Sequence, residues 1–348
     1  MEKVYLNEFN PKSELIVKVN IIKKAKYPCI DIHTHMGSLL LGENYYDAYD
    51  TKEHMEKLKE LNITSVVNLD GLFGKELVKM NYKTKDYSEE ISNFMWIDFE
   101  GINNDVFTKK AKKQIIDCYE KGAKGIKLWK FISLGITNKD GSYLRFDDER
   151  LAVIFETAAE LKIPILMHIA DPTAFFKPIN NKNERIEELQ VNPDWSFCDE
   201  KYFSFNELMT MQDNVIEKHK DTTFIVAHFG SYSENLNHVA KRLDKYPNMY
   251  IDTAARLAEL GRQPYSAREF FLKYQDRILF GTDLTPVDDY RAYYPYFRFL
   301  ETKDEYFDYQ CQGTMPGQGR WKIYGIYLPD EVLHKVYYEN SARILKLL

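Results

Sequence analysis

Short apolar runs of strand length recur eight times along this chain of 348 residues, and amphipathic stretches of helical length separate them. The predicted strands cover residues 29–33, 63–70, 93–100, 124–129, 163–168, 223–228, 248–254 and 277–283. Repeated strand–helix units build parallel sheets, because each helix carries the chain back to the start of the next strand. An open, doubly wound sheet and a closed (β/α)8 barrel both satisfy this alternation.

Four of the predicted strands end in residues of the kind that bind metal ions. The first runs through CysIleAspIleHisThrHis to His33 and His35, the fifth ends in His168, the sixth in His228 and the eighth in Asp283. Closing the sheet brings these four strand ends around one point, whereas an open sheet does not. The sequence therefore predicts an α/β protein with a (β/α)8 TIM barrel.

Alternation along the strands indicates which side chains face the barrel interior. On the first strand, Asp31 is expected to share a face with the two histidines, while Ile30 and Ile32 take the other face. On the fourth strand, the same rule predicts that Lys127 and Trp129 face the interior.

Two segments are longer than usual for a strand-to-helix connection, residues 171 to about 203 after the fifth strand and 284 to about 327 after the eighth. Both leave the carboxyl ends of strands, where barrel enzymes hold their active sites. We expect them to form lids or pocket walls; packing over the barrel mouth for stability alone is the alternative. Residues 1–27 are predicted to be a short N-terminal extension packing on the barrel, and residues 28–348 the barrel itself.

Two helix starts follow from capping-box spacing, in which a serine precedes a glutamate by three positions. Ser204 with Glu207 and Ser266 with Glu269 both fit this spacing. We therefore expect helices to begin directly after Ser204 and Ser266.

Composition excludes several classes of protein. The net charge of -6 argues against nucleic acid as the main partner. No run of eighteen apolar residues exists, so no membrane span is expected, and the N-terminus lacks the apolar core of a signal peptide. Four widely spaced cysteines predict reduced thiols in a cytoplasmic protein. The aromatic content of 14% would suffice for an interface, so homo-oligomerisation stays open.

Several imidazoles and a carboxylate gathered at a partly dry barrel mouth would be costly without a cation to pair with them. Imidazole nitrogens combined with one carboxylate oxygen suit zinc best, and manganese and iron are the alternatives. We therefore predict one divalent metal ion, Zn²⁺ ahead of Mn²⁺ or Fe²⁺.

The motifs and their order resemble the amidohydrolase superfamily, in particular its amidohydrolase-related branch. HisThrHis after the first strand, GlyIleLysLeu at the fourth, AlaHisPheGly at the sixth and LeuPheGlyThrAsp at the eighth carry the resemblance, with His168 and the closing TyrGluAsnSerAlaArgIleLeu. It covers about residues 28–348. The branch contains single-metal hydrolases, lactonases and nonoxidative decarboxylases, so the resemblance implies one of these activities.

The resemblance also implies roles for the ligand-type residues. His33, His35, His168 and Asp283 would bind the metal ion, and His228 would stand beside it, orienting the bound water or polarising the substrate. The number of metal ions stays open, and it depends on the role of Lys127 on the fourth strand.

Two-metal members of the superfamily use a carboxylated lysine or a glutamate as a bridge, and Lys127 lies on the strand from which such a lysine would come. We favour one metal, because GlyIleLysLeu also occurs in members of the branch that resemble single-metal enzymes. Lys127 would then be an interior cation paired to Asp98 or Glu100.

A divalent ion with an open coordination position lowers the pKa of its water to about 7. Asp283 is our candidate for the proton shuttle, although it could be purely a ligand, and His228 for a hydrogen-bond donor to the developing oxyanion. The predicted function is hydrolysis of a small carbonyl compound: a lactone, an amide or an ester. A decarboxylase of an aromatic or unsaturated acid is the main alternative, and a sugar-acid isomerase is another. A purely structural metal site fits poorly, because five ligand-type residues exceed the usual four.

Arg256, after the seventh strand, is the candidate for binding a carboxylate or phosphate on the substrate. A salt bridge from Arg256 to a neighbouring helix is the competing interpretation. Asp70, Trp129 and Lys127 are also predicted to contact the substrate. We therefore expect a small, anionic substrate whose identity the sequence does not reveal.

Overall fold

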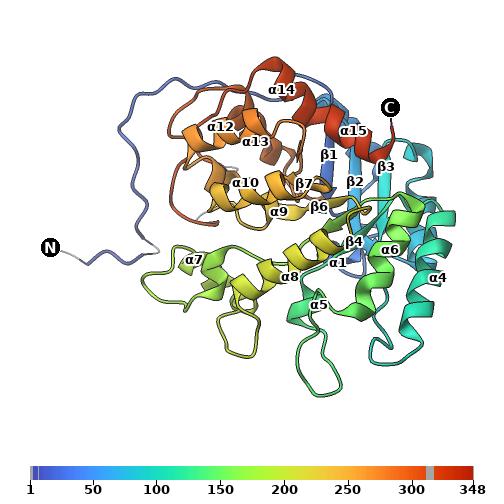
Figure 1. The fold of residues 1–348 in the computed structure, drawn as a ribbon. Coiled ribbons are helices and arrows are strands. Elements are labelled where there is room, and N and C mark those ends of the chain that lie inside the picture. Colours follow the sequence, from blue (N-terminus) through green and yellow to red (C-terminus); the bar gives the residue numbers. More distant parts are fainter. Residues whose placement is uncertain (1–2, 7, 311–316, 348) are drawn as a thin grey trace.

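The computed structural model describes residues 3–6, 8–310 and 317–347. Eight parallel strands pair in chain order, so that each strand lies beside the next one in the sequence (Figure 1). They are β1 (Cys29–Thr34), β2 (Ile63–Leu72), β3 (Ile91–Met95), β4 (Gly125–Leu128), β5 (Ile165–Met167), β6 (Phe224–Val226), β7 (Met249–Asp252) and β8 (Ile278–Leu279). All eight predicted strands are present, and most are shorter than predicted.

The sheet closes on itself between β1 and the segment that follows β8. The backbone nitrogen of Ile32 donates to the carbonyl oxygen of Phe280 at 3.0 Å, and that of Asp283 donates to the carbonyl of His33 at 2.8 Å. Closure joins the two ends of the sheet, and the predicted (β/α)8 barrel is therefore confirmed.

Helices surround the barrel and follow most of its strands (Figure 1). They are α1 (Ser38–Leu41), α2 (Thr51–Glu60), α3 (Gly74–Lys83), α4 (Phe107–Glu120), α5 (Phe131–Leu134), α6 (Ala152–Leu161), α7 (Ile186–Val191), α8 (Phe205–Lys218), α9 (Ala227–Gly230), α10 (Leu236–Lys245), α11 (Leu257–Leu260), α12 (Pro264–Lys273), α13 (Tyr294–Glu301), α14 (Asp330–His334) and α15 (Asn340–Leu345). Within the part of the chain that the structure describes, none of these helices has both the length and the hydropathy needed to cross a membrane.

One of the two predicted helix starts is correct. Ser204 caps α8, and its side chain and that of Glu207 form the reciprocal capping box. The prediction at Ser266 is wrong, because α12 already begins at Pro264. Proline suits the first helical position, since its fixed φ is helical and its missing N–H has no partner there.

The barrel interior holds a small apolar cluster that is distinct from the larger core between strands and helices. Its members come from β1, β2, β3, β5, β6 and β8 and from the residue after β6: Ile32, Val67, Leu69, Phe94, Leu166, Ile225, Leu279 and Ala227. Lys127 lies in register with Leu166, and Leu166 with Ile225, so Lys127 faces the interior as predicted.

The predicted alternation along β1 is wrong. Ile32 belongs to the interior cluster, whereas the Asp31 side chain accepts hydrogen bonds from Thr282 at 2.5 Å and from Tyr293 at 3.0 Å. The cause is a shift in the pairing of β1 with β2 between Asp31 and Thr34, which breaks the simple two-residue period.

The two long connections carry helices of their own. The connection after β5 contains α7 and short 3-10 turns, and the one after β8 contains α13. Residues 311–316 of the second connection lie outside the described residues. Residues 8–24 contain no helix or strand, so the predicted division into an extension and a barrel stays a prediction.

Candidate metal centre

The two histidines at the end of β1 are fully buried, and a carboxylate holds each ring. Nδ1 of His33 lies 2.8 Å from Oδ2 of Asp252, and Nδ1 of His35 lies 2.6 Å from Oδ1 of Asp70. A carboxylate only accepts hydrogen bonds, so both rings donate from Nδ1. Each neutral ring therefore presents a lone pair on Nε2, which is the arrangement of a metal-binding histidine.

Asp283 faces both of these lone pairs. Its Oδ1 lies 3.3 Å from Nε2 of His33 and 3.1 Å from Nε2 of His35, and within the described ranges neither nitrogen has a hydrogen-bond partner. Lone pairs that face one another at this distance repel unless a proton or a cation lies between them. Burial lowers the pKa of His35, but Asp283 and Asp70 outweigh it and the net pKa is raised. The two nitrogens and the carboxylate therefore fit a divalent metal ion.

Backbone geometry holds Asp283 in this position. Its φ of 72° is in the left-handed region, which is strained for an aspartate, and its N–H donates to the carbonyl of His33. The neighbouring Gly281 leaves space for the histidine, because a Cβ there would lie 3.0 Å from Cβ of His33. Asp31 ties β1 to the same segment through Thr282, so the closure of the barrel sets the distance between His33 and Asp283.

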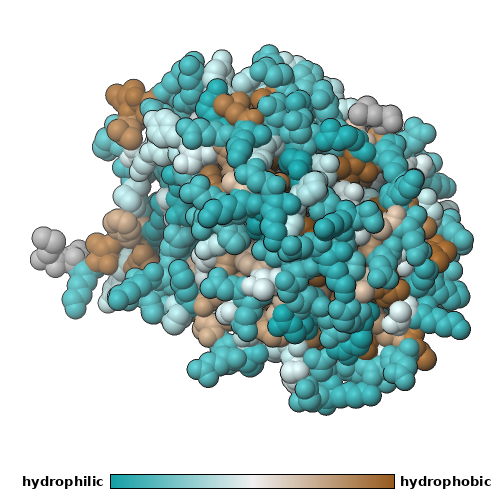
Figure 2. All heavy atoms as spheres, viewed as in Figure 1, coloured by the Kyte–Doolittle hydropathy of each residue, from teal (hydrophilic) through white to brown (hydrophobic). Residues whose placement is uncertain are grey.

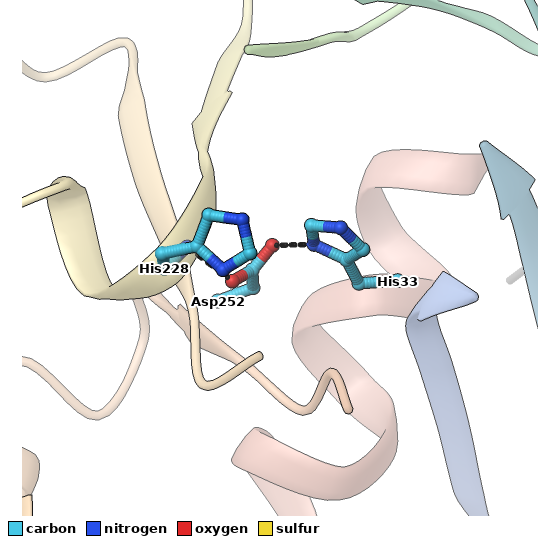
Figure 3. Close-up of side chains that lie close together, drawn as sticks. All are labelled: His33, His228 and Asp252. Atoms are coloured by element: carbon cyan, nitrogen blue, oxygen red, sulfur yellow. Dashed lines mark hydrogen bonds and ion pairs between the residues drawn. The ribbon is translucent and has the colours of Figure 1, made fainter. Parts of the chain in front are cut away.

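Asp252, at the end of β7, connects His33 to His228 (Figure 3). Its Oδ2 accepts from the His33 ring, and its Oδ1 accepts from the backbone N–H of His228 at 2.8 Å. Nδ1 of His228 lies 3.0 Å from the carbonyl oxygen of Ala254 and must donate to it. Nε2 of His228 is therefore an acceptor when the ring is neutral, and burial holds the pKa of His228 well below its ordinary value.

His168 lies beside His228 rather than in the group formed by His33, His35 and Asp283. Its Nδ1 is 3.3 Å from Nε2 of His228, and its Nε2 is 3.2 Å from Oδ1 of Asp171. In the described part of the chain, two groups have ligand atoms within 4.8 Å of one another: His33, His35 and Asp283, and His33, His228 and Asp252. The role of His168 as a metal ligand stays a prediction.

A cavity of about 420 Å³ opens beside these residues. His168, His228 and Asp283 line it, and residues of both long connections form its walls. The wall residues include Pro172, Phe175, Arg185, Glu188, Asp194, Trp195, Phe197 and Gln318. The connections thus form pocket walls, in agreement with one of the two expectations for them.

The comparison with protein families agrees with this geometry. A family model described as Amidohydrolase matches residues 88–347, which is most of the chain. The chain belongs to the amidohydrolase family. Among proteins of curated function, no match is found.

Solved structures of similar fold include two decarboxylases and a hydratase. The 2,6-dihydroxybenzoate decarboxylase from Rhizobium is 13% identical with a TM-score of 0.57, over 93% of this chain and 99% of that one. A dihydroxybenzoic acid decarboxylase from Polaromonas, with bound manganese and the inhibitor 2-nitroresorcinol, is 11% identical with a TM-score of 0.53, over 93% and 97%. The 4-oxalomesaconate hydratase from Rhodopseudomonas palustris is 12% identical with a TM-score of 0.52, over 91% and 95%. At such identities the likeness shows the fold alone.

Arg256 of this amidohydrolase lines the cavity and is buried. Its Nη1 donates to the carbonyl of Ala255 at 2.8 Å, and across the residues described here no carboxylate pairs with it. The neighbouring Arg262 is different, because Glu184 accepts from it at 2.9 Å. The described residues therefore contain no salt bridge from Arg256 to a neighbouring helix, which was the competing interpretation.

Two of the residues predicted to contact the substrate, Asp70 and Lys127, do not line this cavity. Asp70 is buried behind His35, where it also accepts from the backbone N–H of Gly37, and it is not among the cavity-lining residues. Lys127 is also absent from the lining, although Trp129 is present. The causes differ: the Asp70 side chain contacts the ring of His35, and the Lys127 side chain faces the barrel interior.

Lys127 is fully buried, and its Nζ has no hydrogen-bond partner among the described residues. The predicted pairing with Asp98 or Glu100 is wrong, since both carboxylates lie near Lys110 instead. Burial lowers the pKa of Lys127 to about 8, while Asp283, Asp252 and Asp70 act in the opposite direction.

Sequence reasoning missed three polar residues of the site, Asp252, Asp171 and Lys130, and it gave Asp70 a different role. Asp252 and Asp70 orient the histidines of β1, and Lys130 donates to Asp171 at 2.5 Å beside His168. Asp252 stands near the end of a predicted strand, as Asp283 does. The rule that found Asp283 would have found Asp252 too.

Proposed function

We propose that this amidohydrolase is a metal-dependent hydrolase of a small, anionic carbonyl compound. The proposal rests on one observation. The lone pairs on Nε2 of His33 and Nε2 of His35 both face the carboxylate of Asp283, beside a cavity of about 420 Å³. A cavity of this size suits a small molecule.

The donor set fits one divalent cation. Imidazole nitrogens with a carboxylate oxygen favour Zn²⁺, and Mn²⁺ and Fe²⁺ fit the same set. When bound, such an ion lowers the pKa of a coordinated water to about 7 and polarises a carbonyl oxygen. His33, His35 and Asp283 would hold it, with His168 as the further predicted ligand.

Asp283 is the residue we assign to proton transfer. Its side chain is 28% exposed, whereas those of His33 and His35 are 1% exposed, so the carboxylate reaches the cavity and the rings do not. It would accept a proton from the attacking water and return it to the leaving group.

His228 orients the attacking water in this proposal. Of its two expected roles, donation to an oxyanion is disfavoured, because the bond to Ala254 takes the ring's one proton. The acceptor nitrogen Nε2 is suited to receive a hydrogen bond from water.

Arg256 would bind the anionic group of the substrate. A guanidinium that is buried, lines the cavity and lacks a carboxylate partner among the described residues would be stabilised by an anion. The anionic group of the substrate would therefore lie beside Arg256 in the cavity.

Decarboxylation of an aromatic acid is the second candidate, and the cavity walls favour it. Trp129, Phe131, Phe175, Trp195 and Phe197 line the cavity, and such walls suit a planar ring. The decarboxylases of similar fold act on ring acids by name.

A screen of the metal-loaded enzyme separates the two candidates. Lactones, amides, esters and aromatic carboxylates are incubated in H₂¹⁸O and in D₂O, and products are followed by mass spectrometry. Hydrolysis gives a product that contains ¹⁸O. Decarboxylation gives loss of CO₂ and deuterium on carbon. Turnover that survives complete removal of metal would contradict both.

A further inference from the structure

The N-terminal arm, residues 8–22, is held at both ends but not between them. The backbone N–H of Asn20 donates to Asp304 at 2.7 Å, and near the other end the carbonyl of Leu6 accepts from Arg320 at 2.7 Å. Between these points the arm, dark blue in Figure 1, arches away from the helices as extended chain.

The middle of the arm combines exposed apolar side chains with unpaired backbone. Leu15, Ile16, Val19 and Ile21 are each at least 62% exposed, and Figure 2 shows brown side chains on the side of the molecule where the arm runs. From residue 12 to 19, all of them described, the backbone makes a single hydrogen bond, from Leu15 to the hydroxyl of Ser13. Valine and isoleucine favour strands, so this segment has the properties of an edge strand without a neighbour.

The barrel of a second copy offers no free sheet edge, because the barrel is closed. A second copy does offer its own arm. We propose that the arms of two copies pair as antiparallel strands over residues 12–20, about a twofold axis at Ile16, and so form a homodimer.

Charge favours an axis at Ile16 over one at Glu14 or Lys18. With this axis Glu14 lies opposite the partner's Lys18, and the twofold symmetry produces the same pair a second time. An axis at Glu14 or at Lys18 would place like charges opposite each other. The axis at Ile16 also sets Leu15 opposite the partner's Val17 on the other face of the strands.

Two strands alone are marginally stable in water, so the apolar face of this ribbon needs cover. A cavity of about 240 Å³ lies at the root of the arm, between Ile21 and the first turn of α13 at Tyr294 and Pro295. Arg291, Arg298, Asp308 and Gln310 also line it, so Tyr294 and Pro295 are the apolar surface that it offers to the ribbon.

Disulfide trapping tests the axis. In a background in which Cys198 and Cys311 are replaced by serine, Ile16→Cys is compared with Val19→Cys. Opposite residues of an antiparallel pair have Cα atoms roughly 4.5–5.5 Å apart, within the range of a disulfide, whereas the two copies of residue 19 would be about 20 Å apart. We expect a covalent dimer on mild oxidation of Ile16→Cys and none with Val19→Cys. Equal cross-linking of both variants, or of neither, would overturn the proposal.

A charge swap tests the pairing itself. Sedimentation equilibrium should show a dimer of the full chain, which Glu14→Lys weakens by roughly tenfold and Glu14→Lys with Lys18→Glu restores. Tyr265→Lys, at an exposed position on α12, is the control and should leave the dimer unchanged. A monomeric wild-type chain, or a double variant as weak as the single one, would refute pairing in this register.

Discussion

The two pairs of histidines at the barrel mouth are held in different ways. His33 and His35 each donate to a carboxylate and turn their free nitrogens toward Asp283. His168 and His228 contact each other, and the carboxylate near them, that of Asp171, is paired with Lys130.

The barrel mouth thus has two halves, the β1 half with His33 and His35 and the other half with His168 and His228. The difference between them indicates which half is arranged to bind a cation. A carboxylate behind an imidazole raises its basicity and fixes its orientation, so the β1 half is organised to bind a metal ion. Near His168, Lys130 compensates the carboxylate: burial raises the pKa of Asp171, but Lys130 and His168 lower it well below its ordinary value. Burial lowers the pKa of His168 itself to about 4, so this half supplies neutral rings.

The largest effect is expected at the carboxylate that both rings of the β1 half face. Asp283→Asn should lower kcat by roughly 10²–10⁴-fold, because it removes the proton acceptor while keeping the shape of the side chain. Steady-state kinetics on a substrate found in the screen measures the effect, and circular dichroism checks that the fold is intact. Turnover at the wild-type rate would remove Asp283 from the mechanism.

The next-largest effect is on metal affinity, and it should differ between the two halves. Asp70→Asn and Asp252→Asn should each weaken metal binding by roughly 10–100-fold, because each removes the carboxylate that orients a ring. Asp171→Asn, in the other half, should weaken it less. Competition with a chelating dye measures the affinities.

Asp98→Asn is the matched control, since that carboxylate pairs with Lys110 away from the histidines. If Asp171→Asn costs as much affinity as Asp70→Asn, the contrast between the halves is wrong.

A smaller effect concerns the substrate rather than the metal. Arg256→Gln should raise KM by roughly tenfold to a hundredfold with little change in kcat, because one charged hydrogen-bonding group is lost. Arg262→Gln serves as the control, because the guanidinium of Arg262 pairs with Glu184. An unchanged KM in Arg256→Gln would contradict the assignment of the anionic group of the substrate to Arg256.

His54, outside both halves, provides a reference for a neutral buried ring. It contacts the hydroxyl of Tyr290 at 2.7 Å, and burial lowers its pKa to about 4. The unfolded chain binds a proton there below about pH 6.5 and the folded chain does not, so stability should fall as the pH drops from 6.5 toward 4. The loss attributable to His54 is about 2 kcal/mol at pH 5.

His54→Gln should flatten that part of the stability curve, measured by chemical denaturation at several pH values. A curve as steep as that of the wild type would show that His54 does not stay neutral in the folded protein.

Much of the fold was predictable, because eight apolar runs and the residues at their ends follow a simple rule for parallel barrels. The break of alternation at Asp31 was not predictable, since it depends on how β1 pairs with its neighbour. The predicted helix start at Ser266 was wrong for a local reason, because the helix already begins at Pro264.

The candidate site was predictable in part. His33, His35 and Asp283 come together as the sequence indicated. The position of Asp70 behind His35 depends on distances across the barrel, which no local pattern contains, and so does the lack of a hydrogen-bond partner for Lys127 among the described residues.

The central claim is that Nε2 of His33, Nε2 of His35 and the carboxylate of Asp283 share one divalent ion. Anomalous diffraction at the zinc edge from crystals of the zinc-loaded protein tests it most directly. We expect a single strong peak at roughly 2.0–2.2 Å from each of these ligand atoms. A peak elsewhere in the molecule, with none between these three residues, would contradict the account.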